Sequence, residues 1–189
     1  MPARIATYAT RRPRPKPARA VGAGVSLLEV LLALAIVALL AVQAVPAAQG
    51  LLAKQRLKGA AEIIGAELRA ARLEAIRANR SLAVRFVIQD SGQWCMGISD
   101  AGPCACDREE CLIDGRPAPR LDSTALPHIR LASNFPGHLL RFGPLRGGAR
   151  PGTLRVRIAG ESEKEMRIVV SSLGRIRLCA VRLRGYPPC

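Results

Sequence analysis

An almost uninterrupted apolar run, residues 25–48, constrains this chain more than any other feature of its sequence. Its clearly polar side chains are Ser26, Glu29 and Gln43. At a rise of about 1.5 Å per residue, a helix of this length spans the roughly 30 Å hydrocarbon core of a bilayer. A carboxylate within such a helix costs about 2.5 kcal/mol or more, so Glu29 is expected to have a function. The run therefore predicts a transmembrane helix, with a kink at Pro46 near its outer end.

A basic segment, residues 1–24, precedes the apolar run. It contains no acid and six basic residues: Arg4, Arg11, Arg12, Arg14, Lys16 and Arg19. The prolines of "RRPRPKPARA" disfavour a helix, and positive charge beside an apolar run holds that end in the cytoplasm. The alternative is an ordinary secretory signal peptide. The run is too long for a signal-peptide core, however, and no convincing small-x-small cleavage site ends it.

The apolar pattern continues beyond residue 48 in amphipathic form. Within residues 49–80, one set of apolar residues recurs at spacings of three or four: Leu57, Ala61, Ile64, Leu68, Ala71 and Ala75. This spacing places the set on one face of a helix, whose other faces are mostly charged. We therefore predict one long helix that ends near residue 80, with one half in the membrane and the other packed on a globular domain, residues 81–189.

Short runs of strand-forming residues follow the predicted helix. They are "SLAVRFVI", "QWCMGIS", "HIRLAS", "LLRFG", "TLRVRIA" and "MRIVVSS". Turn residues separate them, in "DSG", "FPG", "LRGGARPG" and "SLGR". Consecutive short strands joined by turns predict an antiparallel β-sheet domain, with one face covered by the helix. The expected fold class is α+β.

The junction of the basic segment and the apolar run resembles the class III signal of type IV pilins and pseudopilins. The resemblance rests on Gly24, followed by an apolar run with Glu29 at its fifth position. It implies that a prepilin peptidase cuts after Gly24 and that Val25, which stands where the family usually has Phe, becomes N-methylated. Pro46 would then be the twenty-second mature residue, where the family often has Pro. The remaining alternative is an ordinary single-span membrane protein.

The same resemblance implies a role for Glu29 in assembly. Its carboxylate would meet the amino terminus of a neighbouring subunit inside a filament. An unpaired charge is costly in such a low-dielectric environment, so the pairing would favour correct packing of subunits.

The globular part resembles the GspH/FimT group of pilin-like proteins. The resemblance rests on five segments in order: "LRAARLEAIRANRSLAVRF", the "WC-x-G" strand, the "CACDREEC" loop, "FPG" and "VVSSLGRIRLC". It implies a pilin-like fold and a non-enzymatic subunit in the bacterial inner membrane, with a periplasmic domain. Such subunits occur in small numbers, at the filament tip or in the initiating complex. The group includes minor pilins of type IV pili and the H pseudopilin of type II secretion, and the sequence does not choose between them.

The cysteines all follow the apolar run, and their even number indicates disulfides in an oxidising compartment. They are Cys95, Cys104, Cys106, Cys111, Cys179 and Cys189. Cys104 and Cys106 are too close in sequence to bond to each other. The first four are expected to form two local bridges with the pairing open, and Cys179 and Cys189 to close the terminal loop. A zinc site is the alternative, but exported cysteines are normally oxidised and no His lies near, so no metal or cofactor is expected.

The sequence shows no catalytic constellation. It has no Ser/His/Asp arrangement and no paired carboxylates in a plausible pocket, and "RGGARPG" lacks the Lys-Ser/Thr of a phosphate loop. We therefore expect no enzyme. The formal net charge of +15 instead favours acidic partners.

The carboxy-terminal segment, residues 166–189, contains no acid and five arginines: Arg167, Arg175, Arg177, Arg182 and Arg184. In "GRIRLCAVRLRG", arginines alternate with apolar residues, which predicts that they share one side of a strand or extended loop. Such a stripe can bind phosphates.

The tetrapeptide "GRIR", residues 174–177, matches the Gly-Arg-x-Arg motif of DNA-binding FimT proteins of natural transformation. The match implies that Arg175 and Arg177 contact double-stranded DNA, and Arg182 and Arg184 extend the patch by charge and proximity. Binding is expected to be independent of sequence and to fall steeply with salt. The alternatives are a solvated basic face that meets acidic filament neighbours or anionic lipid, and an H-type pseudopilin with no DNA role.

Overall fold

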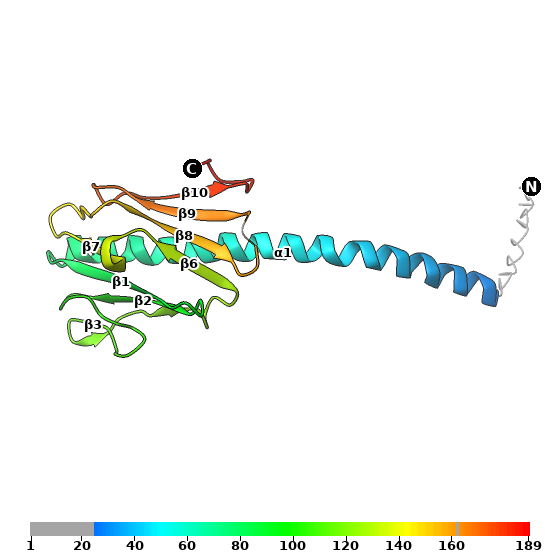
Figure 1. The fold of residues 1–189 in the computed structure, drawn as a ribbon, viewed down its shortest axis with the longest axis horizontal. Helices are drawn as coiled ribbons and strands as arrows, with labels where there is room; N and C mark the ends of the chain where they lie inside the picture. Colours follow the sequence, from blue (N-terminus) through cyan, green and yellow to red (C-terminus); the bar gives the residue numbers. More distant parts are fainter. Residues whose placement is uncertain (1–24, 162) are drawn as a thin grey trace, which may run out of the picture. The chain divides into compact units, whose positions relative to one another are not determined.

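The computed structural model describes residues 25–161 and 163–189 (Figure 1). The expected leader, including Gly24, lies outside these residues. The chain divides into a first unit that ends at Ala44 and a second unit, Val45–Cys189. The helix α1, Leu27–Arg77, begins in the first unit and ends in the second.

In the first unit, α1 is an apolar helix with exposed side chains. Large apolar residues from Leu27 to Val42 are exposed to solvent. By length and composition, α1 contains a stretch able to cross a membrane, and none of that stretch is buried. The helix assignment continues through position 46, so the kink proposed for Pro46 stays a prediction.

In the second unit, α1 presents the predicted apolar face to the core. All six residues assigned to that face are at most 4% exposed: Leu57, Ala61, Ile64, Leu68, Ala71 and Ala75. Removal of this face from water stabilises the unit by about 25 cal/mol per Å² of apolar area.

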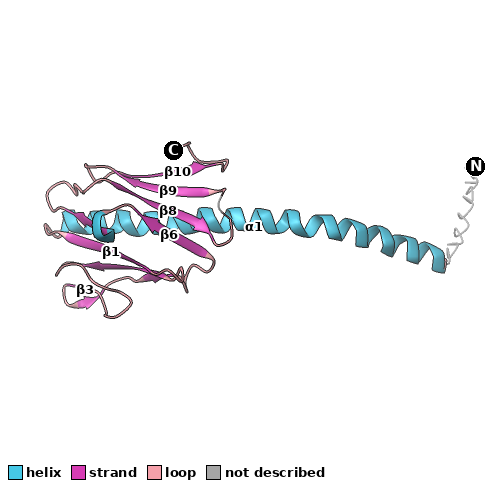
Figure 2. Ribbon diagram, viewed as in Figure 1, coloured by secondary structure: helices cyan, strands magenta, loops and turns pink. Residues whose placement is uncertain are grey.

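Two four-stranded antiparallel sheets share one hydrophobic core with α1 (Figure 2). The first has the order β5-β2-β1-β7, with β1 at Leu82–Ile88, β2 at Trp94–Ser99, β5 at Leu121–Asp122 and β7 at Leu139–Phe142. The second has the order β10-β9-β8-β6, with β6 at Ile129–Ser133, β8 at Gly152–Ile158, β9 at Glu165–Val170 and β10 at Ile176–Val181. A small hairpin joins β3, Leu112–Ile113, to β4, Arg116–Pro117, and a short 3-10 helix spans Pro136–His138.

The α+β fold class is confirmed, with one difference in the number of sheets. The six predicted runs correspond to β1, β2, β6, β7, β8 and β9, and the segment "GRIRLCAVRLRG", expected as a strand or extended loop, contains β10. The strands β3, β4 and β5 were not expected, since two residues are too few to show an alternating pattern. The division into two sheets depends on pairing between distant segments, which periodicity does not reveal.

Aromatic side chains connect the two sheets inside the core. Trp94 of β2 donates a hydrogen bond from Nε1 to the carbonyl oxygen of Ile129 in β6, at 2.9 Å. Phe135, from "FPG", stacks on Phe86 of β1 with ring centroids 6.0 Å apart. A side chain on Gly152 would come within 2.3 Å of the Phe135 ring, so this position requires glycine.

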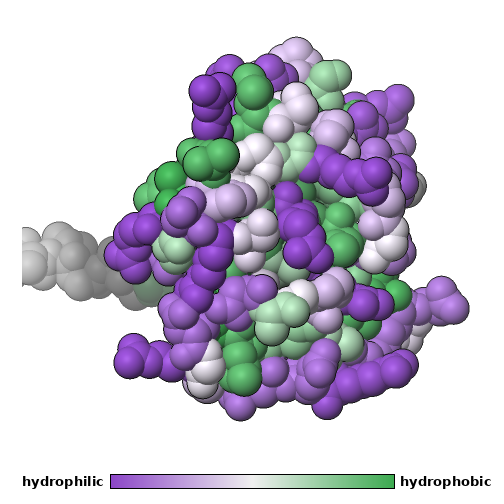
Figure 3. Space-filling model, turned by 90° about the vertical axis from the view of Figure 1, so that its left-hand side faces the viewer, coloured by the Kyte–Doolittle hydropathy of each residue, from purple (hydrophilic) through white to green (hydrophobic). Residues whose placement is uncertain are grey.

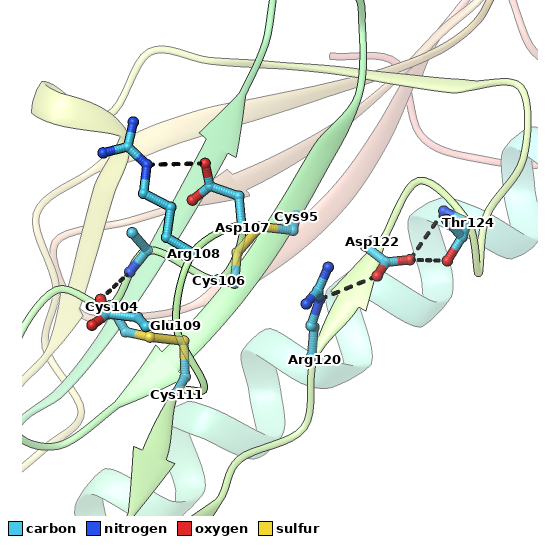
Figure 4. Close-up of a disulfide and its surroundings, with 11 residues drawn as sticks. Cys95, Cys104, Cys106, Asp107, Arg108, Glu109, Cys111, Arg120, Asp122 and Thr124 are labelled. Atoms are coloured by element: carbon cyan, nitrogen blue, oxygen red, sulfur yellow. Dashed lines mark hydrogen bonds and ion pairs between the residues drawn. A yellow bond between two sulfur atoms is a disulfide. The ribbon is translucent and has the colours of Figure 1, made fainter.

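Three disulfides fix the loops of the second unit. The pairs are Cys95–Cys106, Cys104–Cys111 and Cys179–Cys189. The first two lie together beside β2 (Figure 4). Gly97, from "WC-x-G", makes room for them, because a Cβ there would lie 2.4 Å from the Cys111 sulfur. The zinc alternative requires free thiolates, and in the structure all six cysteines are bonded to one another.

Candidate functional site

The amino-terminal end of α1 carries the residues predicted to act in processing and assembly. Val25 and Glu29 are both exposed. Ser26 caps the helix, because its Oγ accepts a hydrogen bond from the Glu29 backbone N–H at 3.2 Å. "SLLE" has the Ser-x-x-Glu spacing of a capping box, a signal that our sequence interpretation of Glu29 missed. Glu29 can therefore act in the cap of its own helix, as an alternative to pairing with another subunit.

Arg175 and Arg177 lie where β9 turns into β10. Their side chains are exposed. The turn is held by two hydrogen bonds between Ser171 and Arg175: the Ser171 N–H donates to the Arg175 carbonyl at 3.0 Å, and the Arg175 N–H donates to Ser171 Oγ at 3.2 Å. Ile176 and Leu178 pack against the core, so strand alternation turns Arg177 away from α1.

Arg182 and Arg184 lie beyond the other end of β10, which ends at Val181. Arg182 has a φ of 54°, so strand alternation does not continue through it. Its guanidinium lies 3.9 Å from the carboxylate of Glu163. The six residues of β10 extend about 20 Å at roughly 3.3 Å each, so the four arginines do not form the single stripe that the alternation predicted.

The outer face of the second sheet gathers arginines from four strands. Arg167 of β9 lies opposite Arg155 of β8. Arg157 of β8 lies opposite Arg130 of β6. Arg177 of β10 lies opposite Val169, which is two residues after Arg167 on β9 and therefore on the same face. We call these five residues the sheet-face arginines. The sequence interpretation did not join them, because only the strand register shows that they are neighbours.

A buried carboxylate organises part of this face. Glu165 is 3% exposed and forms ion pairs with Arg157 and Arg167. Desolvation by itself would raise the pKa of Glu165, but hydrogen bonds from the two guanidinium groups outweigh it and hold the pKa below its usual value. Arg130 donates to the carbonyl oxygen of Ser91. Arg155 and Arg177 are therefore the sheet-face arginines most available to a partner.

An exposed apolar helix that continues beneath antiparallel sheets defines a pilin-like protein. A family model described as "Type II transport protein GspH" matches residues 60–174, more than half of the chain. The chain therefore belongs to the GspH family, and it is a minor pilin or pseudopilin of the GspH/FimT type.

Two solved structures resemble the chain at low sequence identity. The type IV minor pilin FimU of Pseudomonas aeruginosa is 21% identical, with a TM-score of 0.47, over 65% of this chain and 91% of that chain. The minor pseudopilin EpsH from the Type 2 Secretion System of Vibrio cholerae is 19% identical, with a TM-score of 0.48, over 66% of this chain and 97% of that chain. A search among curated proteins gives no match.

Family membership defines the general role of the chain. The family is structural rather than enzymatic, and it implies assembly with other pilins or pseudopilins. The apolar half of α1 suits the single-pass membrane anchoring that is typical of the family. Across residues 25–161 and 163–189, no three His, Cys, Asp or Glu side chains are grouped as metal ligands.

Proposed function

We propose that this protein is a minor pilin that joins or primes a type IV pilus and binds double-stranded DNA. Prepilin peptidase would cut between Gly24 and Val25, and Val25 would be N-methylated. Glu29 would pair within the filament. The globular unit would lie in the periplasm and, at the filament tip, reach the cell surface.

The observation that carries the DNA proposal is the exposed pair Arg175 and Arg177 at one end of β10. In the described part of the chain, no carboxylate forms an ion pair with either residue. Arg155 lies on the same sheet face as Arg177, and the chain carries a formal net charge of +15. Exposed arginines without acidic partners attract a phosphate backbone, whose neutralisation releases counterions.

The second candidate is an H-type pseudopilin of a type II secretion system with no DNA role. The description of the matching family model, which names type II transport, favours it. In that case the arginines would form a solvated face or meet acidic neighbours in the filament.

DNA binding by the full-length protein in zwitterionic nanodiscs separates the two candidates. We expect Arg175→Ala/Arg177→Ala to make the negative slope of log affinity against log salt shallower by about 2, since each phosphate contact contributes about 0.9. The matched control is Arg108→Ala/Arg116→Ala, which removes two exposed arginines from the disulfide loop and the adjoining hairpin. The leader carries six basic residues of its own, so all variants must have the same amino terminus. Absence of binding by the unmodified chain at low salt would leave the secretion pseudopilin as the better proposal.

A further inference from the structure

Two loops distant in sequence lie against each other at one end of the second unit. One is the β7–β8 loop, residues 143–151, and the other is the β9–β10 turn, residues 171–175. The Ala149 N–H donates to the Ser172 carbonyl at 3.0 Å. A Cβ on Gly174 would lie 1.7 Å from the Gly147 carbonyl oxygen, which shows how closely the two backbones approach. We call this pair of loops the arginine tip.

A half-buried guanidinium from α1 fastens the two loops together. Arg72 donates from Nε to the Gly147 carbonyl at 3.2 Å and from Nη2 to the Arg146 carbonyl at 3.0 Å. The same Nη2 lies 3.4 Å from the Leu173 carbonyl in the other loop. One planar fork thus satisfies carbonyls of both loops, so their relative position is fixed by the fold.

This arrangement brings the backbone of a second loop that bears arginines against the turn that carries Arg175. Arg146 and Arg150 are exposed on the β7–β8 loop, and Arg141 is exposed on β7. Arg141 and Arg150 line a surface cleft of about 470 Å³, together with other residues of the β7–β8 loop and with Ser81, Pro136 and Leu139. Within residues 25–161 and 163–189, none of these four arginines has a carboxylate in ion-pair contact. Like charges held together without acids favour an extended polyanion as partner.

The arginine tip lies well beyond the apolar run along the helix. Arg72 lies 24 residues after the end of the apolar run at residue 48, which corresponds to about 36 Å along the helix. Figure 3 looks onto the end of the unit where β9 joins β10, and hydrophilic residues project around it with apolar residues between them. Leu145 and Leu173, in these two loops, are 85% and 75% exposed, so lipid binding needs its own experiment.

We propose that the arginine tip is one composite binding surface for the backbone of double-stranded DNA. Arg146 and Arg150 contact phosphates together with Arg175. This inference rests on the proposed function and extends it from the "GRIR" segment to a second loop. Binding through phosphates predicts equal affinity for duplexes of unrelated sequence.

The decisive experiment compares two double variants in the full-length protein in zwitterionic nanodiscs. Fluorescence anisotropy would follow two duplexes of unrelated sequence across a salt series. We expect Arg146→Ala/Arg150→Ala to make the salt slope shallower by about 2 for both duplexes, the same change as expected for Arg175→Ala/Arg177→Ala. The control Arg108→Ala/Arg116→Ala should leave the slope unchanged. The substituted side chains are exposed and the Arg146 carbonyl bound by Arg72 remains, so thermal unfolding should be unaltered.

Each other outcome has a definite meaning. If Arg146→Ala/Arg150→Ala binds as the unmodified chain does while Arg175→Ala/Arg177→Ala loses binding, the composite surface is wrong and the proposed function stands. If the unmodified chain binds neither duplex at low salt, both proposals fall. If it binds vesicles of anionic phosphatidylglycerol through these arginines and no duplex, lipid is the partner and the inference is overturned.

Discussion

At the residue scale, Gly174 shows that part of a motif associated with DNA binding is required by packing. Its φ is +71°, a region that disfavours side chains, and a Cβ there would lie 1.7 Å from the Gly147 carbonyl oxygen. Backbone strain alone typically costs about 1–3 kcal/mol. We predict that Gly174→Ala lowers the free energy of unfolding by more than this amount. Gly115→Ala is the matched control, because Gly115 has a φ of +69° and nothing within 4 Å of its Cβ position. Equal losses for the two variants in urea unfolding would contradict an important role for the close approach of the loops.

The arginines show how much of the candidate site the residue patterns of the sequence predict. "GRIR" directs attention to Arg175 and Arg177, and both are exposed as that interpretation requires. Arg155 is placed on the same sheet face as Arg177 only through the register of three strands. The contact of Arg72 with the Leu173 carbonyl spans 101 positions. Local periodicity carries no information on contacts of that separation, so the arginine tip was not predictable from the sequence.

At the scale of elements, the period of α1 made its buried face predictable, and adjacent isoleucines allow a sharp test. Ile64 is fully buried, whereas Ile63 is 44% exposed. We predict that Ile64→Ala lowers the free energy of unfolding by about 2–5 kcal/mol, because it leaves a cavity in the core. Ile63→Ala should change it by about 0.5 kcal/mol or less, since a surface position loses little packing. Chemical denaturation of both variants checks the prediction, and comparable losses would show that α1 packs with a different face.

The strands were predictable as elements but not as sheets. Alternation identified six of them, because each carries enough residues to show a period of two. The pairing of β1 with β7 and of β6 with β8 joins segments separated by other strands. Such pairing depends on how side chains fill the shared core, which local sequence does not encode.

At the scale of the whole molecule, the exposed apolar residues of the first unit require a lipid or protein environment. Their removal from water is the main driving force for membrane insertion. Within the membrane, van der Waals packing rather than the hydrophobic effect holds them against neighbouring helices. Glu29 is the exception within this segment, and two explanations compete for it. It can complete the helix cap with Ser26, or it can pair with a charge on another subunit.

A comparison of Glu29→Ala with Ser26→Ala distinguishes capping from intersubunit pairing. Loss of the Ser26 cap costs about 1 kcal/mol of helix stability, which a membrane-embedded helix tolerates. We predict that both variants insert into the membrane, as measured by fractionation, but that only Glu29→Ala fails to enter filaments. Mass spectrometry of the filament-derived protein should show a first residue at Val25, since the pairing proposed for Glu29 requires the amino terminus that the cut at Gly24 would form. Normal incorporation of Glu29→Ala into filaments would exclude the pairing role. If Ser26→Ala failed to enter filaments as well, Glu29 would be assigned to the helix cap, because only the capping explanation makes the serine as necessary as the carboxylate.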